Sequence, residues 1–363
     1  MTQAKKANEL QSAQSDAARS QVKDSEIANL AGPADSTEQT LASNSPTDAG
    51  RDLMTLIMLY LSALALAFFL FSFLGRYFFL AELLGNFRLQ LSVLMVPLAL
   101  TVFRIGRWRW LALSLIIATG WSFFSLGSVY FPATQPPEGP KKLRIMSFNV
   151  LGYNPMRDEV IEEMHKTDPD VIVVLEYTHI WHGRLSRLDS EYPHQVLQPR
   201  WHGFGMAVFS KHPLSDTSVT QLTKEVTDNP LIITNVSFGE QKIRLCGAHV
   251  LSPTSSLRLE LRNQQYDELA QELGNDDVPT VVLGDFNSVP WSPFVNDLLK
   301  KTGYRDSRQG FGFHASWHAE YPILLIPIDH AFVSDDICVH SRTLGSNAGS
   351  DHLPIIVEVS TAQ

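Results

Sequence analysis

Residues 1–50 contain no aromatic side chain. They are rich in Ser, Ala, Gln, Asn, Asp and Thr, so they cannot bury enough apolar surface to offset the entropy lost on ordering. This composition excludes a packed core in the segment, and we expect a disordered polar tail. The segment also lacks the apolar stretch that follows the basic start of a secretory signal peptide.

Only two cysteines occur among the 363 residues, Cys246 and Cys338. Both stand among residues typical of strands, where a free thiol behaves as a small apolar side chain. We therefore expect two buried thiols. A disulfide between them is the alternative, which an extracytoplasmic location would permit without requiring it.

Two long stretches lack charged residues. Residues 53–74 and 110–131 each run for 22 residues without a charge. As helices they would each span roughly 33 Å, enough for a bilayer core of about 30 Å. Residues 89–103 are apolar but shorter, and we interpret them as a third span, with a re-entrant or interfacial segment as the alternative. Residues 51–131 are thus expected to form a transmembrane region of three helices, with residues 77–88 near the interface.

Positive side chains gather between the second and third expected spans, at Arg104, Arg107 and Arg109. Short loops rich in Lys and Arg favour the cytoplasmic side of a membrane. This predicts a multi-pass membrane protein with a cytoplasmic N-terminus and everything after Phe131 outside. The basic residues at 141–144 argue weakly for the opposite orientation.

The remaining residues suit a linker and one globular domain. Residues 132–140 hold four prolines and a glycine, which indicates a stiff linker. Residues 141–363 carry 19 Lys and Arg against 28 Asp and Glu, a formal net charge of −9, whereas residues 1–140 balance at 10 and 10. An acidic domain disfavours binding of nucleic acid through many electrostatic contacts to phosphates. A local basic patch would still permit nucleic-acid binding.

The apolar pattern of residues 141–363 alternates between strands and helices. Strands are expected at 143–148, 171–175, 206–210, 231–238, 242–249, 280–283, 328–333 and 353–359. Helices are expected at 157–166, 257–273 and 294–301. No internal repeat of short fixed period is present. Buried strands with a few helices favour an α/β fold of two packed sheets flanked by helices.

Polar side chains follow the expected strands at the points where they end. Asp285 and Asn287 come directly after Val281–Leu283, and five other strand ends have the same layout. Each residue taken singly is typical of a turn, a helix cap or core packing, so only the repetition indicates a shared site. Carboxylate and amide oxygens suit Mg²⁺, a carboxylate can orient a water, and a histidine can donate to a phosphate oxygen.

Six short segments carry a resemblance to a known superfamily. They read Ser-Phe-Asn-Val at 147–150, Leu-Glu at 175–176, Ala-His at 248–249, Gly-Asp-Phe-Asn at 284–287, Ile-Asp-His at 328–330 and Ser-Asp-His at 350–352. In this order they resemble the endonuclease/exonuclease/phosphatase superfamily over roughly residues 141–360. Gly-Asp-Phe-Asn at 284–287 and Ser-Asp-His at 350–352, some sixty residues apart, form the most specific pair. Three membrane spans before such a domain resemble a group of bacterial membrane-anchored members, which implies a location in a bacterial cytoplasmic membrane.

The resemblance implies a four-layer α/β sandwich and metal-dependent hydrolysis of phosphoesters. By motif match, Glu176 resembles the metal ligand, with Asn149 beside it and Asp351 as a further acid near metal or water. The remaining matches resemble groups that act on water or phosphate. They are Asp285 for orienting the water, Asn287 as the transition-state amide, His352 as the phosphate contact, Asp329 as the carboxylate that orients it, and His249 as a general acid or phosphate ligand.

Two further features are less diagnostic. Arg200 and His202 lie in a loop that enters an expected strand, and either can be assigned to substrate binding or to a plain surface loop. The segment 311–321 gathers aromatic and histidine residues, which fits a substrate rim, a face that lies on lipid, or a packed loop.

The expected function is therefore a membrane-anchored phosphoesterase that uses Mg²⁺, with Mn²⁺ as an alternative. Frequencies within the superfamily favour an endonuclease or exonuclease, whereas the anchor and the acidic domain favour a lipid headgroup hydrolase of the phospholipid, phosphoinositide or sphingomyelin type. A catalytically inactive binding module is the third hypothesis. It predicts losses at the metal and water positions, and no such loss is seen. No obligate protein partner is inferred.

Overall fold

The computed structural model describes residues 46–131, 141–224, 226–274 and 278–362. The chain divides into an N-terminal unit, Met1–Leu56, and a second unit, Ile57–Gln363. Most of the expected polar tail and the whole Pro-rich linker lie outside the described residues.

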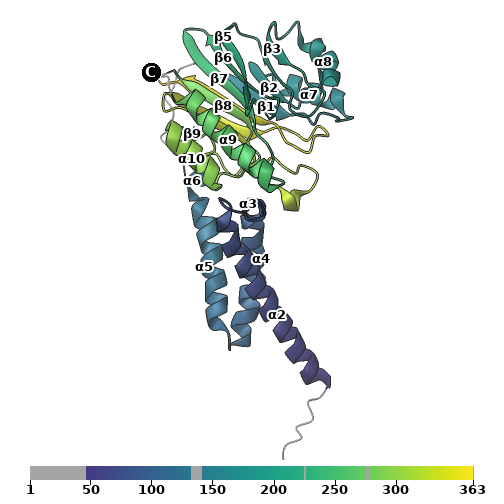
Figure 1. Cartoon of the computed structure of the whole chain (residues 1–363), viewed down its shortest axis with the longest axis vertical. Helices are drawn as coiled ribbons and strands as arrows, with labels where there is room; N and C mark the ends of the chain where they lie inside the picture. Colours follow the sequence, from purple (N-terminus) through teal and green to yellow (C-terminus); the bar gives the residue numbers. More distant parts are fainter. Residues whose placement is uncertain (1–45, 132–140, 225, 275–277, 363) are drawn as a thin grey trace, which may run out of the picture. The chain divides into compact units, whose positions relative to one another are not determined.

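Helices form the region before the linker (Figure 1). They are α2 (Pro46–Phe71), the 3₁₀ turn η1 (Ser72–Leu74), α3 (Phe79–Asn86), α4 (Arg88–Ile105), α5 (Arg109–Ser125) and α6 (Gly127–Tyr130). By length and composition alone, two described stretches could cross a membrane, Gly50–Leu74 and Arg88–Ile105. The expected third span, 110–131, is not one helix, because α5 ends at Ser125 after 17 residues and α6 follows.

The long helices pack through a mixture of small and large apolar side chains. One cluster joins Ala65 and Phe69 of α2 to residues of α4 and α5, among them Ala99 and Ala118. Ser92 Oγ of α4 donates to Ser122 Oγ of α5 at 2.7 Å. Small residues and interhelical hydroxyl bonds are the contacts that hold helices together where the surroundings are apolar.

The region after the linker contains two six-stranded mixed sheets. The first has the order β11-β12-β1-β2-β4-β3 and the second β5-β6-β7-β8-β10-β9. The strands of the first sheet are β1 (Leu143–Asn149), β2 (Val171–Leu175), β3 (His194–Gln198), β4 (Met206–Ser210), β11 (Ile337–Leu344) and β12 (Ile355–Thr361). Those of the second are β5 (Leu214–Leu222), β6 (Asn229–Phe238), β7 (Gln241–His249), β8 (Thr280–Asp285), β9 (Arg305–Asp306) and β10 (Asp329–Val333).

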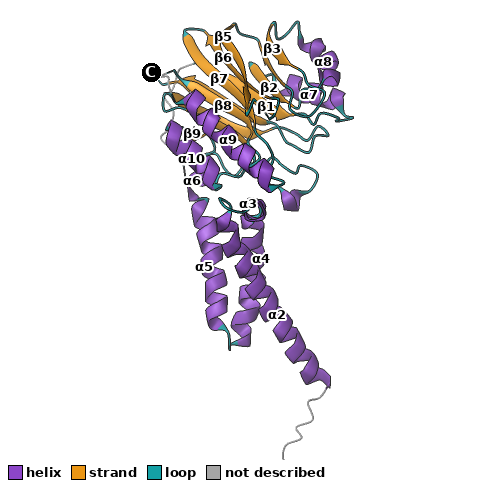
Figure 2. Ribbon diagram, in the orientation of Figure 1, coloured by secondary structure: helices purple, strands orange, loops and turns teal. Residues whose placement is uncertain are grey.

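Helices cover the outer face of each sheet, which confirms the expected four-layer sandwich (Figure 2). They are α7 (Arg157–Thr167) and α8 (His179–Leu185) beside the first sheet, and α9 (Ser256–Leu273) and α10 (Pro293–Thr302) beside the second. Three apolar clusters lie between these layers. The central one joins residues of both sheets, such as Val173, Leu245 and Val357, and the outer ones lie under the two helix pairs.

Strand register brings the predicted polar residues to one edge of each sheet. In the first sheet, parallel β1 and β2 end together, with Asn149 opposite Leu175. In the second, parallel β7 and β8 end with His249 opposite Asp285. Asp329 begins the antiparallel strand β10 and lies opposite Asp285. Parallel strands end at the same edge of their sheet, which explains why residues distant in sequence meet there.

Both cysteines have free thiols. Cys246 is buried, as expected, but Cys338 is only half-buried. The burial expected for Cys338 is wrong because β11 is an edge strand whose residues are mostly half-buried.

Helix α3 covers most of residues 77–88, which were expected near the membrane interface. A buried ion pair joins this helix to the sandwich. Glu82 Oε1 accepts from Arg262 Nη1 of α9 at 3.0 Å and from Ser292 Oγ at 2.8 Å. The Glu82 and Arg262 side chains are 3% and 0% exposed. Removing one partner of such a buried pair typically costs about 3–5 kcal/mol.

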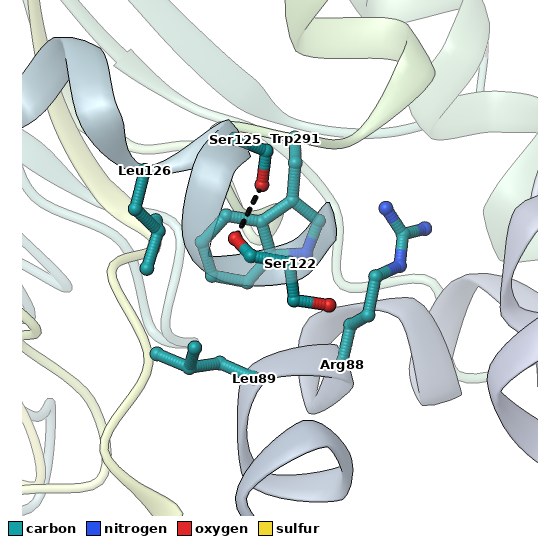
Figure 3. A pocket seen from close by; sticks show the side chains of 6 residues that line it. All are labelled: Arg88, Leu89, Ser122, Ser125, Leu126 and Trp291. Atoms are coloured by element: carbon teal, nitrogen blue, oxygen red, sulfur yellow. Dashed lines mark hydrogen bonds between the residues drawn. The ribbon is translucent and has the colours of Figure 1, made fainter. Parts of the chain in front are cut away.

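The loop after β8 makes a second connection to the same helix. Trp291 Nε1 donates to the carbonyl of Gly85 at 2.7 Å. Figure 3 shows the Trp291 ring beside Arg88 and Leu89 of α4 and beside Ser122, Ser125 and Leu126. The segment 286–292 therefore connects the end of β8 directly to the helical region.

Gly284 should be the least replaceable glycine near the end of β8. A Cβ at this position would lie 1.7 Å from the carbonyl oxygen of Ala248, at a φ of +151°. We expect Gly284→Ala to displace β8 and to lower the melting temperature of the full chain by much more than the control Gly303→Ala.

Gly303 has a φ of +74° and nothing within 4 Å of the added Cβ, so its replacement tests backbone strain alone. That strain costs about 1 kcal/mol, or about 2–4 °C in melting temperature for a domain of this size. Melting is followed by tryptophan fluorescence. Equal decreases in melting temperature for the two variants would contradict the steric argument.

Candidate active site

A cleft of about 410 Å³ opens at the strand ends described above. Six of the predicted site residues line it, and they come from both sheets and the loops after them: Glu176, His249, Asp285, Asn287, Asp351 and His352. Asn149 and Asp329 lie directly behind these residues and touch them through the hydrogen bonds below.

Asn149 connects the two sheets at the floor of the site. Its Nδ2 donates to Glu176 Oε1 at 3.2 Å and to Asp285 Oδ2 at 3.3 Å. Its backbone carbonyl accepts from Ser350 Oγ at 2.7 Å, next to the Asp351–His352 pair. One buried amide therefore fixes the mutual positions of three of the strand ends.

Glu176 adopts a backbone conformation that is uncommon for a residue with a side chain, with a φ of +58°. Its Oε2 accepts from the backbone N–H of Gly152 at 2.8 Å. Burial raises the pKa of this carboxyl, and the hydrogen bonds from Gly152 and Asn149 only partly offset the effect. A buried carboxylate with few partners is suited to receive a positive charge.

His352 and Asp329 form a buried hydrogen-bonded pair. His352 Nδ1 lies 2.8 Å from Asp329 Oδ2, which also accepts from Ser316 Oγ at 2.5 Å. Burial alone would lower the pKa of His352, but the carboxylates of Asp329 and Asp285 raise it to about 10. Burial alone would raise the pKa of Asp329, but the charge and hydrogen bond of His352 outweigh it and lower that pKa. At neutral pH the pair is an imidazolium beside a carboxylate, with Nε2–H directed towards the cleft.

Asp285 faces that imidazolium from the second sheet. Its Oδ2 lies 3.7 Å from His352 Nε2 and 3.6 Å from His249 Nε2, and its Oδ1 accepts from the backbone N–H of Asn287 at 2.8 Å. Burial raises the pKa of Asp285 to about 7, against the opposing charge of His352. A carboxylate with a pKa near neutrality is suited to accept a proton from water.

His249 and Asn287 flank Asp285. Burial lowers the pKa of His249 to about 3, so the imidazole is neutral. Among the described residues its Nδ1 has no hydrogen-bond partner. Asn287 Nδ2 donates to the carbonyl of Val250 at 2.9 Å, which orients the side-chain amide at the cleft wall.

Two groups of residues fit a metal ion differently. Asp285, Asp329 and His352 place ligand atoms within 4.8 Å of one another and so could hold one. However, a protonated His352 whose Nδ1 is bonded to Asp329 has no free lone pair for a metal. Asp351 Oδ1 is buried without a hydrogen-bond partner among the described residues, while its Oδ2 accepts from Trp317 Nε1 at 3.0 Å. Asp351 and Glu176, whose burial is only partly offset by hydrogen bonds, together form a set of oxygen donors that suits a hard divalent cation.

The structure does not bring Arg200 and His202 to the cleft. Arg200 Nε pairs with Asp228 at 2.6 Å. His202 is exposed beside Phe204, which itself lines the cleft together with Gly203. The loop therefore contributes to the cleft through Gly203 and Phe204, and not through the side chains of Arg200 and His202.

Several lining residues escaped the sequence-based prediction. Leu83, Asn86 and Phe87 come from the helical region, and Arg258 comes from α9. Trp317, which also lines the cleft, belongs to the aromatic segment 311–321. The aromatic clustering was a usable signal for Trp317, but no pattern near residue 86 indicates a contact with strand ends far along the chain.

Removal of Asp329 should neutralise His352. Asp329→Asn removes both the nearest negative charge and the hydrogen-bonded acceptor, so the pKa of His352 is expected to fall from about 10 towards or below neutrality. At pH 8 the imidazole would then be protonated in the native chain and neutral in the variant. NMR of histidine-labelled, metal-free protein measures this pKa, with His352→Gln to assign the signal.

The control is Asp335→Asn, whose side chain is 82% exposed and pairs with Arg305. An unchanged His352 titration in Asp329→Asn would show that the pair does not set the charge of the site.

Comparisons with known proteins bear on this constellation. The model of the endonuclease/exonuclease/phosphatase family matches residues 146–352. A comparison with curated proteins gave no match.

Several solved structures have a similar fold. The endonuclease/exonuclease/phosphatase from Beutenbergia cavernae DSM 12333 has a TM-score of 0.52 at 18% identity, over 61% of this chain and 72% of that one. D. rerio TDP2, solved with a single-strand DNA product, has a TM-score of 0.53 at 18% identity, over 61% and 100%. Truncated Caenorhabditis elegans TDP2 has a TM-score of 0.50 at 16% identity, over 60% and 97%.

At such identities these structures establish the fold alone. The family match, in contrast, covers more than half of the chain and includes every strand end that meets in the cleft. The chain therefore belongs to the endonuclease/exonuclease/phosphatase family.

Proposed function

We propose that the protein is a membrane-anchored hydrolase of phosphoesters that depends on a divalent cation. The observation that carries this proposal is the buried convergence of an imidazolium, a carboxylate of near-neutral pKa and an oxygen-rich ligand set in one cleft. The family membership supports phosphoester bonds as the target.

The proposed chemistry divides between two sides of the cleft. Asp285 holds the attacking water through a carboxylate oxygen and accepts its proton. His352, kept protonated by Asp329, donates Nε2–H to a phosphoryl oxygen and offsets the charge that grows there. Neutral His249 and the amide of Asn287 offer further hydrogen bonds to oxygens of the phosphoryl group. No part of this scheme needs a side chain to move far, because Asn149 already fixes the strand ends.

Glu176 and Asp351, with Asn149 beside them, would hold the cation. Mg²⁺ suits their oxygen donors, and Mn²⁺ is the alternative. A divalent cation bound there would polarise a phosphoryl oxygen and support the leaving group. It would also relieve the mutual repulsion of Glu176 and Asp351.

The proposed anchor is the helical region, and the contacts of α3 constrain its topology. Helix α3 precedes α4 and α5, yet it contacts the sandwich that follows them. Both sides of that contact must lie on the same side of a membrane. Consequently α4 and α5 either both cross the membrane or both remain on the side where α3 lies. The hydropathy of α4 favours crossing. Three spans with a cytoplasmic N-terminus would place α3 and the sandwich outside together.

Loss of Asp285 should abolish hydrolysis without unfolding the chain. With the full chain in detergent, Mg²⁺ and bis-p-nitrophenyl phosphate, we expect Asp285→Asn to lower kcat by about 10²- to 10⁴-fold, the usual contribution of a positioned general base. The exposed Asp335→Asn serves as the control and should keep the native rate. A fully active Asp285→Asn chain would overturn the assignment.

The two candidate cation sites make opposite predictions. Glu176→Gln and Asp351→Asn should each raise the Mn²⁺ concentration for half-saturation, measured by calorimetry, by about 10- to 100-fold. Asp329→Asn should change this Mn²⁺ concentration little, because Asp329 bonds to His352 and does not bind the cation in this proposal. If Asp329→Asn weakens Mn²⁺ binding most, the cation belongs among Asp285, Asp329 and His352 instead.

A further inference from the structure

One wall of the catalytic cleft comes from the helical region. Leu83 and Asn86 of α3 and Phe87, the residue that joins α3 to α4, line the same cleft as Glu176, Asp285 and His352. The corner that these three residues form is fixed in place by the Glu82–Arg262 ion pair and the Trp291–Gly85 hydrogen bond. The corner is therefore a fixed part of the cleft wall.

Asn86 brings an unused polar group to this wall. Its side chain is buried, with 6% of its surface exposed. Its Oδ1 has no hydrogen-bond partner among the described residues. Burying an amide oxygen without a partner is costly, and a ligand that donates a hydrogen bond inside the cleft would remove that cost.

The rest of the wall is apolar. Leu83 and Phe87 are half-buried, and Phe87 packs on a small cluster that contains Ile326 and Ile328. These two isoleucines also line the cleft. The cleft thus has an acidic and imidazole floor on one side and an apolar wall with a single amide on the other. That division matches a ligand with a phosphoester head and a hydrocarbon body.

An exposed apolar loop lies at the same end of α4. Tyr321, Ile323 and Leu324 are 54%, 80% and 40% exposed. Gln90 Nε2, in the first turn of α4, donates to the carbonyl of Leu325 at 3.0 Å. Since α4 is a candidate membrane span, this contact sets the apolar loop and the cleft wall beside the point where the chain would enter the bilayer.

The charge near the cleft does not favour a polyanion. Residues 141–363 have a formal net charge of −9. Arg258 is the single Lys or Arg among the described residues that line the cleft. Binding of nucleic acid normally relies on several phosphate contacts from such residues.

We propose that the α3–α4 corner is a substrate-binding wall and that the substrate is a membrane phospholipid. Asn86 Oδ1 accepts a hydrogen bond from a donor of the lipid headgroup, and Leu83 and Phe87, with Ile326 and Ile328, contact the first methylene groups of the lipid body. The phosphoester then lies at Asp285 and His352. This inference rests on the phosphoesterase function proposed above, and it makes residues of the anchor determinants of specificity.

The test compares two substrates on the full chain in the presence of Mg²⁺. One is soluble bis-p-nitrophenyl phosphate, and the other is vesicles of phosphatidylethanolamine and phosphatidylglycerol in equal amounts, with headgroup release followed by ³¹P NMR. Asn86→Leu should lower the ratio of kcat/KM for lipid to kcat/KM for the soluble ester by about tenfold, the effect of one buried hydrogen bond. Leu83→Ala should lower the same ratio through a higher KM for lipid.

Asn235→Leu is the matched control. Asn235 is 8% exposed and its Oδ1 also lacks a partner among the described residues, but it lies on β6 and does not line the cleft. The control should leave the ratio unchanged. Melting temperatures of all variants separate loss of folding from loss of binding, and Leu83→Ala, at a half-buried position, keeps the test open if Asn86→Leu unfolds.

Three outcomes overturn the inference. An unchanged ratio in both wall variants would show that the corner does not touch the lipid. Hydrolysis of the soluble ester and of a single-stranded oligonucleotide, without hydrolysis of lipid, would assign the cleft to nucleic acid. Failure of the native chain on every substrate would refute the phosphoesterase itself, and this result is distinct from the other two.

Discussion

The close approach of Gly284 to the carbonyl of Ala248 fixes the end of β8, and the rest of the molecule is organised around that point. On one side of it, Asp285 meets Asn149 and His352 from the other sheet. On the other, the segment 286–292 continues to Trp291 and Ser292, which bind α3. A single backbone contact between neighbouring strands therefore aligns both the chemistry and the attachment of the helical region.

Buried charged side chains near this point bond to one another and to nearby backbone, while Arg308 Nη1 and Arg342 Nε have no hydrogen-bond partner among the described residues. Arg308, fully buried, pairs with Asp306 and contacts the ring of His330, whose Nε2 lies 2.7 Å from the carbonyl of Ser288. Arg342 donates to the carbonyl of Asp329 at 3.2 Å. The strand that carries Asp329 is thus held by cations behind it while its carboxylate faces His352. Such networks add little stability over an apolar core. Removing one member of a buried charge network, however, lowers the stability of the fold strongly, because it leaves an uncompensated buried charge.

The sequence predicts the centre of the fold far better than its borders. The eight strands expected from apolar runs are the interior strands of the two sheets. The four that were missed, β3, β5, β9 and β11, are the edges, where solvent on one side allows polar residues such as those of β5. The same reasoning explains the site. Residues at the ends of interior strands were predictable because register brings them together, whereas Leu83 and Asn86 reach the cleft through a tertiary contact across roughly two hundred residues. Arg200 and His202 do not line the cleft for a related reason, since a position in a loop does not fix where its side chain points.

The ion pair between Glu82 and Arg262 also has a biosynthetic consequence. Its two halves are separated by 180 residues, so the first leaves the ribosome long before the second. Until α9 has folded, Glu82 has no cationic partner at Arg262, and until α3 is in place Arg262 would be an unpaired charge in the core. A fragment truncated to residues 141–363 would keep this defect permanently and would lack one wall of its cleft. Completion of the cleft is thus tied to completion of the helical region, so a chain in which α3 is not yet in place would have an incomplete cleft.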